Sequence, residues 1–140
     1  MINSILIDPF KKEIKRVQID YPGRGLDAFY DLLKTEKTKA IEREEGKPSG
    51  FLFTSVRLDK FNCLYVDDEG LLKRDYELFK IEPYPNPLAG RALVIGHDEG
   101  GETRSTDLGL VQIRKRVTWV EKNRTLVNPL WRFKVYVGGE

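Results

Sequence analysis

The stretch RALVIGHDEGG, residues 91–101, joins a short apolar run to an acidic, glycine-containing loop. The run from Ala92 to Ile95 does not alternate between apolar and polar residues, which is typical of a strand buried on both faces. The residues after His97 are acids and glycines, which favour turns because they bond to the local backbone or accept positive φ. The stretch therefore predicts a buried strand followed by an exposed loop.

Further strands are predicted on both sides of this run. In SILIDPFKKEIKRVQID, residues 4–20, two apolar runs flank Asp8 and Pro9, which predicts a hairpin. Other aromatic and β-branched runs predict the strands FLFTSVRL (51–58), CLYV (63–66), a strand around 78–81, RVTWVEK (116–122) and LWRFKVYV (130–137). The segment EPYPNPLAG, residues 82–90, holds three prolines and is predicted to be a rigid extended connector rather than a central strand.

One amphipathic helix is predicted over about residues 26–34. Its apolar face follows the i, i+3, i+4, i+7 spacing, at Leu26, Phe29, Tyr30 and Leu33. The next segment, residues 34–50, is charged and nearly devoid of apolar side chains. We expect this insert to be solvated and mobile.

A second short helix is predicted near residues 107–115, with Thr106 or Asp107 as its N-cap and Gly109 weakening it. No repeat or domain boundary is evident, so residues 1–140 are predicted to form a single domain. Six to eight short strands with one clear helix indicate an α+β fold built on a mainly antiparallel sheet.

Composition bounds the location of the chain. The sequence has no run of about 18 apolar residues, and its N-terminus lacks the basic and apolar regions of a signal peptide. Its single cysteine cannot form an intramolecular disulfide. These features predict a cytoplasmic protein with no membrane partner, and they leave the oligomeric state open.

Two acidic stretches raise the question of a metal site. VDDEG, residues 66–70, contains Asp67 and Asp68, and HDEGG, residues 97–101, resembles it. A calcium loop needs acids at alternate positions and a bidentate acid at its end, which neither stretch supplies. Both stretches are therefore interpreted as turns that end strands, and no metal site is predicted.

Catalytic and cofactor motifs are absent from the sequence. Cys63 and His97 are the only cysteine and histidine, and a nucleophilic pair would require them to meet in space. No signature surrounds either residue, so Cys63 is predicted to be a buried structural thiol. Neither glycine-rich nucleotide motif is present, and G-x-S-x-G is also missing. The sequence favours a protein that is not an enzyme and carries no cofactor.

The last quarter of the chain is basic. Residues 104–140 hold eight basic and three acidic residues, against a net charge of +2 for the whole chain. Basic and aromatic residues interleave there, which suits phosphate neutralisation and base stacking. A nucleic-acid-binding surface is therefore one hypothesis, with the candidate residues Arg114, Lys115, Arg116, Arg132, Lys134 and Tyr136.

Several segments occur in a telling order: ILIDPFKKEIKRVQI, FYDLL, LYVDDEGLLK, YPNPLAGRALVIGHDEGGE and IRKRVTW. In this order, over residues 5–119, the chain resembles a family of small uncharacterised proteins of bacteriophages, plasmids and other mobile elements. LYVDDEGLLK and PLAGRALVIG are the most specific segments. The chain departs from the pattern between Leu33 and Phe51 and beyond Val120. The resemblance implies an accessory protein acting inside a bacterial host, and it transfers no catalytic role.

Three functional hypotheses follow. The first is a non-enzymatic binding protein that occupies a host protein, such as a defence component, or a small anionic ligand. The second is a nucleic-acid-associated protein that uses the basic C-terminal quarter. The third is an enzyme or small nucleotide pocket, with the candidate ligand-binding residues Arg91, His97, Asp67 and Asp68.

Overall fold

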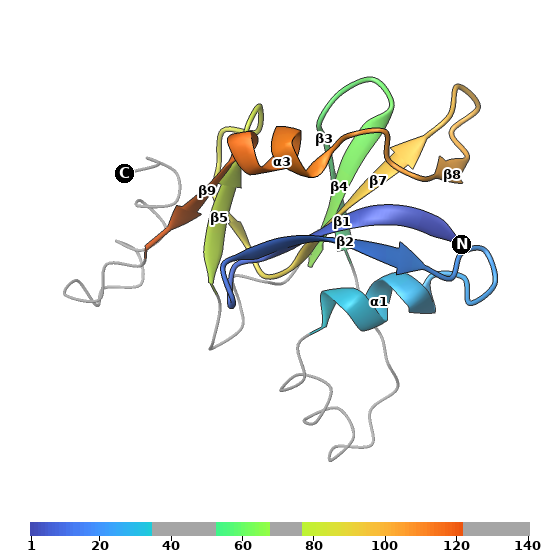
Figure 1. The fold of residues 1–140 in the computed structure, drawn as a ribbon, viewed down its shortest axis with the longest axis horizontal. Coiled ribbons are helices and arrows are strands. Elements are labelled where there is room, and N and C mark those ends of the chain that lie inside the picture. Colours follow the sequence, from blue (N-terminus) through green and yellow to red (C-terminus); the bar gives the residue numbers. More distant parts are fainter. Residues whose placement is uncertain (35–52, 68–76, 122–140) are drawn as a thin grey trace, which may run out of the picture.

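The computed structural model describes residues 1–34, 53–67 and 77–121. In this part of the chain the strands are β1 (Ile2–Asp8), β2 (Glu13–Ile19), β3 (Phe53–Arg57), β4 (Asn62–Asp67), β5 (Leu78–Ile81), β6 (Leu88–Ala89), β7 (Ala92–His97), β8 (Thr103–Arg104) and β9 (Val117–Val120). The helices are α1 (Asp27–Leu33) and α3 (Leu110–Arg116). Every described strand pair is antiparallel, which confirms the α+β fold (Figure 1).

The larger sheet has the order β2-β1-β7-β4-β3, and β8 pairs with β7. Along one side of β7, β4 pairs with residues 92–96. On the other side β1 pairs with residues 92–94, and β8 pairs with Gly96 and His97. The predicted apolar run is thus the central strand, hydrogen-bonded on both sides. A smaller sheet has the order β6-β5-β9.

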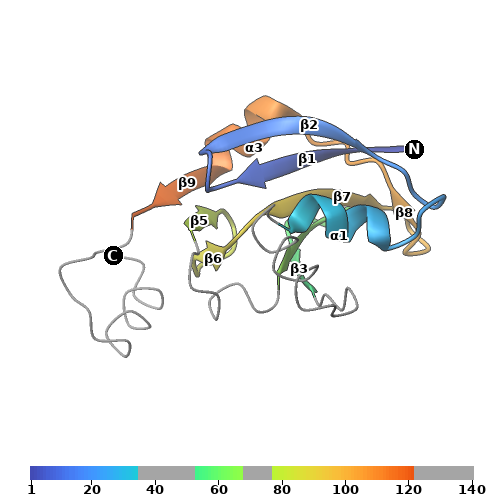
Figure 2. The same cartoon turned by 90° about the horizontal axis from the view of Figure 1, so that it is seen from below.

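The two helices cover opposite faces of the larger sheet. Figure 1 shows α1 and α3 on opposite sides of the β1–β2 hairpin, and Figure 2 shows α1 lying along β7. Side chains alternate along β7, so that Val94 packs with Ile113 of α3, while Leu93 packs with Phe29 of α1. The strand is buried on both faces, as its sequence predicts, because each face has its own covering helix.

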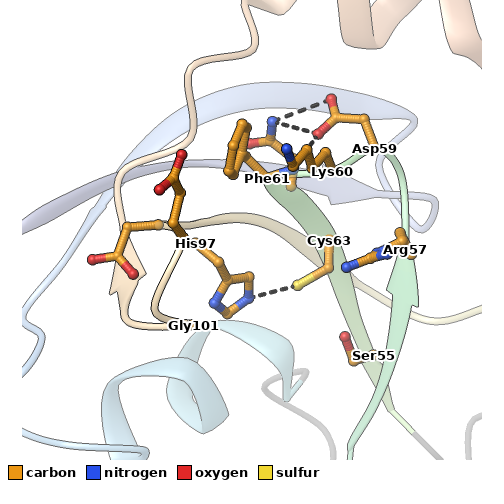
Figure 3. A pocket seen from close by; sticks show the side chains of 11 residues that line it. Ser55, Arg57, Asp59, Lys60, Phe61, Cys63, His97 and Gly101 are labelled. Atoms are coloured by element: carbon orange, nitrogen blue, oxygen red, sulfur yellow. Dashed lines mark hydrogen bonds between the residues drawn. The ribbon is translucent and has the colours of Figure 1, made fainter.

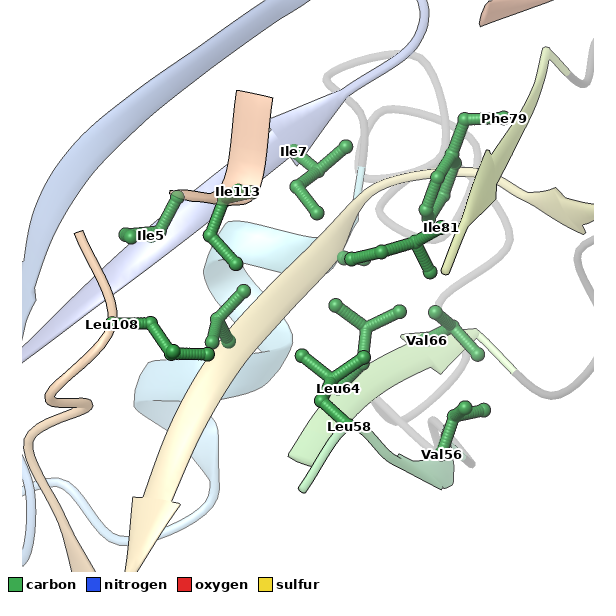
Figure 4. Packing of buried hydrophobic residues seen from close by; sticks show 12 residues of the cluster. Ile5, Ile7, Val56, Leu58, Leu64, Val66, Phe79, Ile81, Leu108 and Ile113 are labelled. Atoms are coloured by element: carbon green, nitrogen blue, oxygen red, sulfur yellow. The ribbon is translucent and has the colours of Figure 1, made fainter. Parts of the chain in front are cut away.

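The larger core cluster joins the two sheets and α3 (Figure 4). Its completely buried side chains come from five elements and include Ile5, Leu64, Phe79, Val94 and Ile113. Each such side chain contributes about 1.5–3 kcal/mol through burial. The smaller sheet is therefore part of the same core as the larger one.

The sequence predicted most elements at the right place. The connector at 82–90 forms no central strand, as predicted, although it contains the two-residue edge strand β6, which pairs with β5. The described strands number nine rather than six to eight. The N-cap of α3 is Gly109, not Thr106 or Asp107. Gly109 has no side chain that could cap the helix, and its N–H instead donates to the side-chain oxygen of Gln112 at 2.6 Å. Predicted features at 34–50 and 130–137 lie largely or wholly outside the described residues.

A buried amide connects the β3–β4 bend to the loop before α3. The amide belongs to Asn62, a residue that is only 3 % exposed. Its Nδ2 donates to Asp59 Oδ1 at 3.0 Å and to Asp107 Oδ1 at 2.8 Å. Its Oδ1 accepts from Thr106 Oγ1 at 2.6 Å. Since both ends of the amide are paired, the two loops are fixed relative to one another.

Gly96 allows the chain to cross β7 closely. A Cβ placed on Gly96 would lie 2.4 Å from the backbone oxygen of Ser105 and 2.9 Å from its carbonyl carbon. These are backbone atoms of the segment that β8 holds against β7. The segment therefore has no flexible side chain that can move aside to admit a methyl group.

We expect Gly96→Ala to lower the free energy of unfolding by about 1–3 kcal/mol, because overpacking forces the backbone to shift. Urea denaturation measures this change. Gly100→Ala is the matched control, because the nearest atom to its Cβ is a carboxylate oxygen of Asp98 at 3.4 Å. Equal stability of the two variants would contradict the steric role of Gly96.

Candidate functional site

Polar side chains gather on one face of three neighbouring strands. Alternation places Ser55 and Arg57 of β3 on the same face as Cys63 and Tyr65 of β4. In the register of the sheet, Arg57 pairs with Cys63, and Ser55 pairs with Tyr65. His97 ends β7 on this face. The five residues thus form one contiguous set, although three separate strands supply them.

This polar set begins where the cover of α1 ends. Phe29 of α1 packs edge-on against the Tyr65 ring, with 5.6 Å between the ring centroids. Tyr65 packs in turn against the His97 ring at 6.2 Å. The same face of the sheet is thus apolar under the helix and polar beyond it.

A cleft of about 660 Å³ opens over Ser55, Arg57, Cys63 and His97 (Figure 3). Its floor contains Ser55, Cys63 and His97, and its walls are two loops. The β3–β4 bend contributes Lys60 and Phe61, and Arg57 lies beside it, while the β7–β8 turn contributes Asp98, Glu99 and Gly101. The β3–β4 wall therefore has a net positive charge, because Arg57 and Lys60 outnumber Asp59, whereas the facing turn carries the acids Asp98 and Glu99.

The β3–β4 wall is held by Asp59. Its Oδ1 accepts the Phe61 backbone N–H at 2.9 Å and an Asn62 side-chain N–H at 3.0 Å. Burial, the largest influence, raises the pKa of Asp59, but the hydrogen bonds from Asn62 and Phe61 together hold it below its usual value. The carboxylate is therefore ionised, and its hydrogen bonds hold the β3–β4 bend in place.

The β7–β8 wall is held in the same way. Asp98 Oδ1 accepts the backbone N–H groups of Gly100 and Glu102, each at 2.9 Å. Gly101 adopts φ +85°, a conformation that glycine accepts without strain. The turn is thus interpreted correctly from the sequence, and it presents Glu99 to solvent at the mouth of the cleft.

Cys63 and His97 meet at the floor. Cys63 Sγ lies 2.9 Å from His97 Nε2, and Tyr65 Oη lies 3.4 Å from the same nitrogen. The His97 backbone is fixed by its N–H donating to the Phe61 carbonyl at 2.7 Å and by its carbonyl accepting from Arg104 Nε at 3.1 Å. Cys63 and His97 are therefore in contact, which the sequence did not predict, and the backbone of His97 is held in place by hydrogen bonds.

The thiol and the phenol of this group are both neutral at neutral pH. Burial raises the pKa of Cys63, and hydrogen bonds from Ser55 and Tyr65 only partly offset it. Burial raises the pKa of Tyr65 to about 12. The contact lets the Cys63 S–H donate to Nε2 in the His97 tautomer that leaves this nitrogen without a proton.

Arg91, a predicted ligand-binding residue, is separated from the cleft. It precedes β7, whereas His97 ends it, so the two lie at opposite ends of the strand. Its Nε lies 3.2 Å from Asp8 Oδ2, and its Nη1 donates to the Lys34 carbonyl at 2.9 Å. Both charged side chains are largely buried, so Arg91 holds β1 and the end of α1 together. The structure therefore does not bring Arg91 and His97 into one site.

The other predicted acids do not join His97 either. Val66 pairs with Ala92 and Asn62 pairs with Gly96, so the end of β4 that leads to Asp67 lies at the far end of β7. The Asp67 side chain and all of Asp68 lie outside the described residues. The third hypothesis, a pocket built from all four residues, thus has one predicted member at the cleft.

The predicted basic residues are divided by the structure. Arg114 and Lys115 are exposed on α3, while Arg116 is half-buried. Arg114 Nη2 donates to the Ile14 carbonyl of β2 at 3.4 Å. Trp119 packs against the larger core, so it is not a stacking platform. The remaining candidates, Arg132, Lys134 and Tyr136, lie outside the described residues.

Sequence reasoning did not predict Ser55, Arg57, Lys60 and Phe61 as residues of the cleft, nor Tyr65 at its border. The period-two alternation of FTSVR and CLYV carried the signal, because it puts their polar residues on one face. This alternation does not predict the contact between β4 and the end of β7, because periodicity within one segment carries no information about which strands are neighbours.

Comparisons of the chain with protein-family profiles, curated proteins and solved structures find no match. The resemblance to mobile-element proteins therefore stays a prediction. Among the described residues, no helix has the length and apolar character needed to cross a membrane. Over the same ranges, no three side chains of His, Cys, Asp or Glu form a group suited to a metal ion.

Alkaline pH should destabilise the chain through Cys63 and Tyr65. Because their pKa values are raised on folding, both groups stabilise the fold below their unfolded pKa values, and this contribution is lost as the pH rises through the folded ones. We expect Tyr65→Phe to flatten the fall in unfolding free energy between pH 10.0 and about 12, measured by urea denaturation. Tyr84→Phe controls for loss of a phenol outside the cleft, and a slope unchanged by Tyr65→Phe would contradict the assignment.

Proposed function

We propose that the chain is a non-enzymatic binding protein whose cleft at the end of β7 recognises a polar segment of a partner. The observation that carries this proposal is the pair of oppositely charged walls above a polar floor. A partner segment that bears both a cation and a carboxylate matches these walls. The resemblance to mobile-element proteins supports a partner inside a bacterial host, such as a defence component.

The construction of the walls suits recognition. Both loops begin and end on strands of one sheet and are fixed by side-chain hydrogen bonds. Pre-formed loops bind with a smaller entropy cost than loops that order on binding. Phe61 lies beneath the cations of Lys60 and Arg104, 5.2 Å and 5.6 Å from its ring centroid, which keeps these charges at the rim.

Binding is favoured over catalysis because the thiol at the floor is not held as a thiolate in the resting protein. The Cys63 thiol holds its proton at neutral pH. Within the described ranges, the side-chain partners of the His97 ring are Cys63 and Tyr65, and no carboxylate orients it. The cleft therefore suits the binding of a partner rather than the turnover of a substrate.

Co-purification at low salt from a bacterial host tests the proposal. We expect native mass spectrometry to show a stoichiometric partner, and Glu99→Lys to weaken the complex about tenfold or more by reversing one wall charge. Glu13→Lys is the control, because it makes the same charge change on β2, at the opposite edge of the sheet. A complex that is equally tight in both variants would place the interface elsewhere.

A second candidate function is nucleic-acid binding through α3 and β2. The contact between Arg114 and the Ile14 carbonyl brings the basic end of α3 beside β2. Arg16 of β2 pairs with Ile5, whose side chain lies on the face that α3 covers. The exposed charges of Arg114, Lys115 and Arg16 thus come together from segments distant in sequence.

This second candidate predicts strongly salt-dependent binding. We expect the affinity for a fluorescent oligonucleotide, followed by anisotropy between about 50 and 200 mM salt, to fall log-linearly. Arg114→Ala with Lys115→Ala should reduce the slope by about one per lost phosphate contact. Arg24→Ala is the control, because Arg24 lies in the turn before α1, where it pairs with Asp31. Binding that is absent or independent of salt would remove nucleic acid as a partner.

A further inference from the structure

The pair of Cys63 and His97 has a chemical capacity that partner binding does not use. Cys63 supplies the only thiol in the chain, and its residue is 7 % exposed at the floor of the cleft. Figure 3 shows its sulfur between the His97 ring and the Arg57 side chain. The cleft thus gives a small molecule a direct approach to the sulfur.

His97 is placed to take the thiol proton. The 2.9 Å contact joins Sγ to Nε2 without an intervening group. Neighbouring strands hold both residues, and the His97 backbone is bonded on both sides. A neutral thiol becomes an effective nucleophile when an adjacent base removes its proton as the new bond forms.

The charge beside the sulfur selects the reagent. Arg57 is the cross-strand neighbour of Cys63, so its guanidinium projects from the same face next to the thiol. Its positive charge favours an anionic group on a bound molecule and stabilises a developing thiolate. Lys60 adds a second cation to the same wall.

We propose that Cys63 is a thiol–disulfide exchange site for low-molecular-weight disulfides that bear a carboxylate, with His97 as its base and Arg57 as the carboxylate contact. This inference does not require the partner proposed above, since it concerns only the floor of the cleft and one wall. It adds a reversible covalent modification to a protein that the first proposal treats as a binder.

The exchange is balanced without a further reagent. The Cys63 S–H bond breaks, and its proton passes to His97 Nε2. The Cys63 sulfur attacks one sulfur of the disulfide, forming a mixed disulfide and breaking the S–S bond of the reagent. The departing thiolate takes the proton from His97 and leaves as a thiol. The disulfide is the oxidant, and one half of it is reduced.

Intact-mass kinetics on the native full chain test this proposal with two probes. Glutathione disulfide carries carboxylates, and bis(2-hydroxyethyl) disulfide is uncharged. At neutral pH we expect glutathione disulfide to react with the native chain faster, relative to the neutral probe, than it does with the chain unfolded in guanidinium. Because the chain has one cysteine, any adduct reports on Cys63, and Cys63→Ser must remain unmodified.

Variants separate the two roles. His97→Gln retains a hydrogen-bond acceptor but not a base, and it should slow both probes about tenfold or more. Arg57→Gln should slow the charged probe several-fold more than the neutral probe, because both probes lose the cation beside the developing thiolate but only the charged probe also loses its carboxylate contact. Arg16→Gln, on the opposite edge strand, should change neither rate. Circular dichroism and thermal melting verify that each variant is folded.

Three outcomes would overturn the proposal. The first is no adduct on the native chain under conditions that modify the unfolded chain. The second is an unchanged rate for the folded His97→Gln variant. The third is the absence of a preference for the charged probe in the wild-type chain, a comparison that needs no variant. Failure of partner binding in the co-purification leaves all three readouts intact, so the two proposals fail separately.

Discussion

The fold depends on the enclosure of β7. This strand is hydrogen-bonded to β4 along one side and to β1 and then β8 along the other, and a helix covers each of its faces. The change from β1 to β8 requires the chain to pass within van der Waals distance of Gly96, where a side chain would meet the backbone of Ser105. The same crossing fixes His97 in its pairing with Thr103. Stability and the position of the candidate site thus share one steric constraint.

The candidate site lies where the apolar cover of the sheet stops. Phe29 and Tyr65 form the border, and beyond them the face carries groups that need hydrogen-bond partners or solvent. Cys63 and His97 satisfy one another there, at the floor of a cleft whose walls are fixed by capped turns. A rigid floor with charged, solvent-accessible loops is the usual division between scaffold and recognition surface. Binding of a partner in the cleft and disulfide exchange at Cys63 would therefore compete for the same space.

Local patterns predicted most elements of the fold. The hairpin around Asp8 and Pro9, the helix that buries Phe29 and Leu33, and the apolar run of β7 are confirmed, because each depends on side-chain periodicity within one segment. Leu26, predicted on the apolar face of this helix, is instead its N-cap and is 50 % exposed. Two details depended on partners that the patterns did not show. The start of α3 is set by the bond between the Gly109 N–H and the Gln112 side chain, and β6 forms because it pairs with β5. Arg91 forms a largely buried ion pair with Asp8, which the sequence around Arg91 did not indicate.

The sequence by itself determined the α+β class, the buried central strand and the absence of nucleotide-cradling motifs, since these follow from composition and short-range spacing. Only the tertiary structure decided which polar residues share a site. The pairing of β4 with β7 brings Cys63 to His97, 34 positions apart in the chain. That pairing is chosen by the packing of two covered faces over the whole sheet, and packing of this kind is a property of all the segments together.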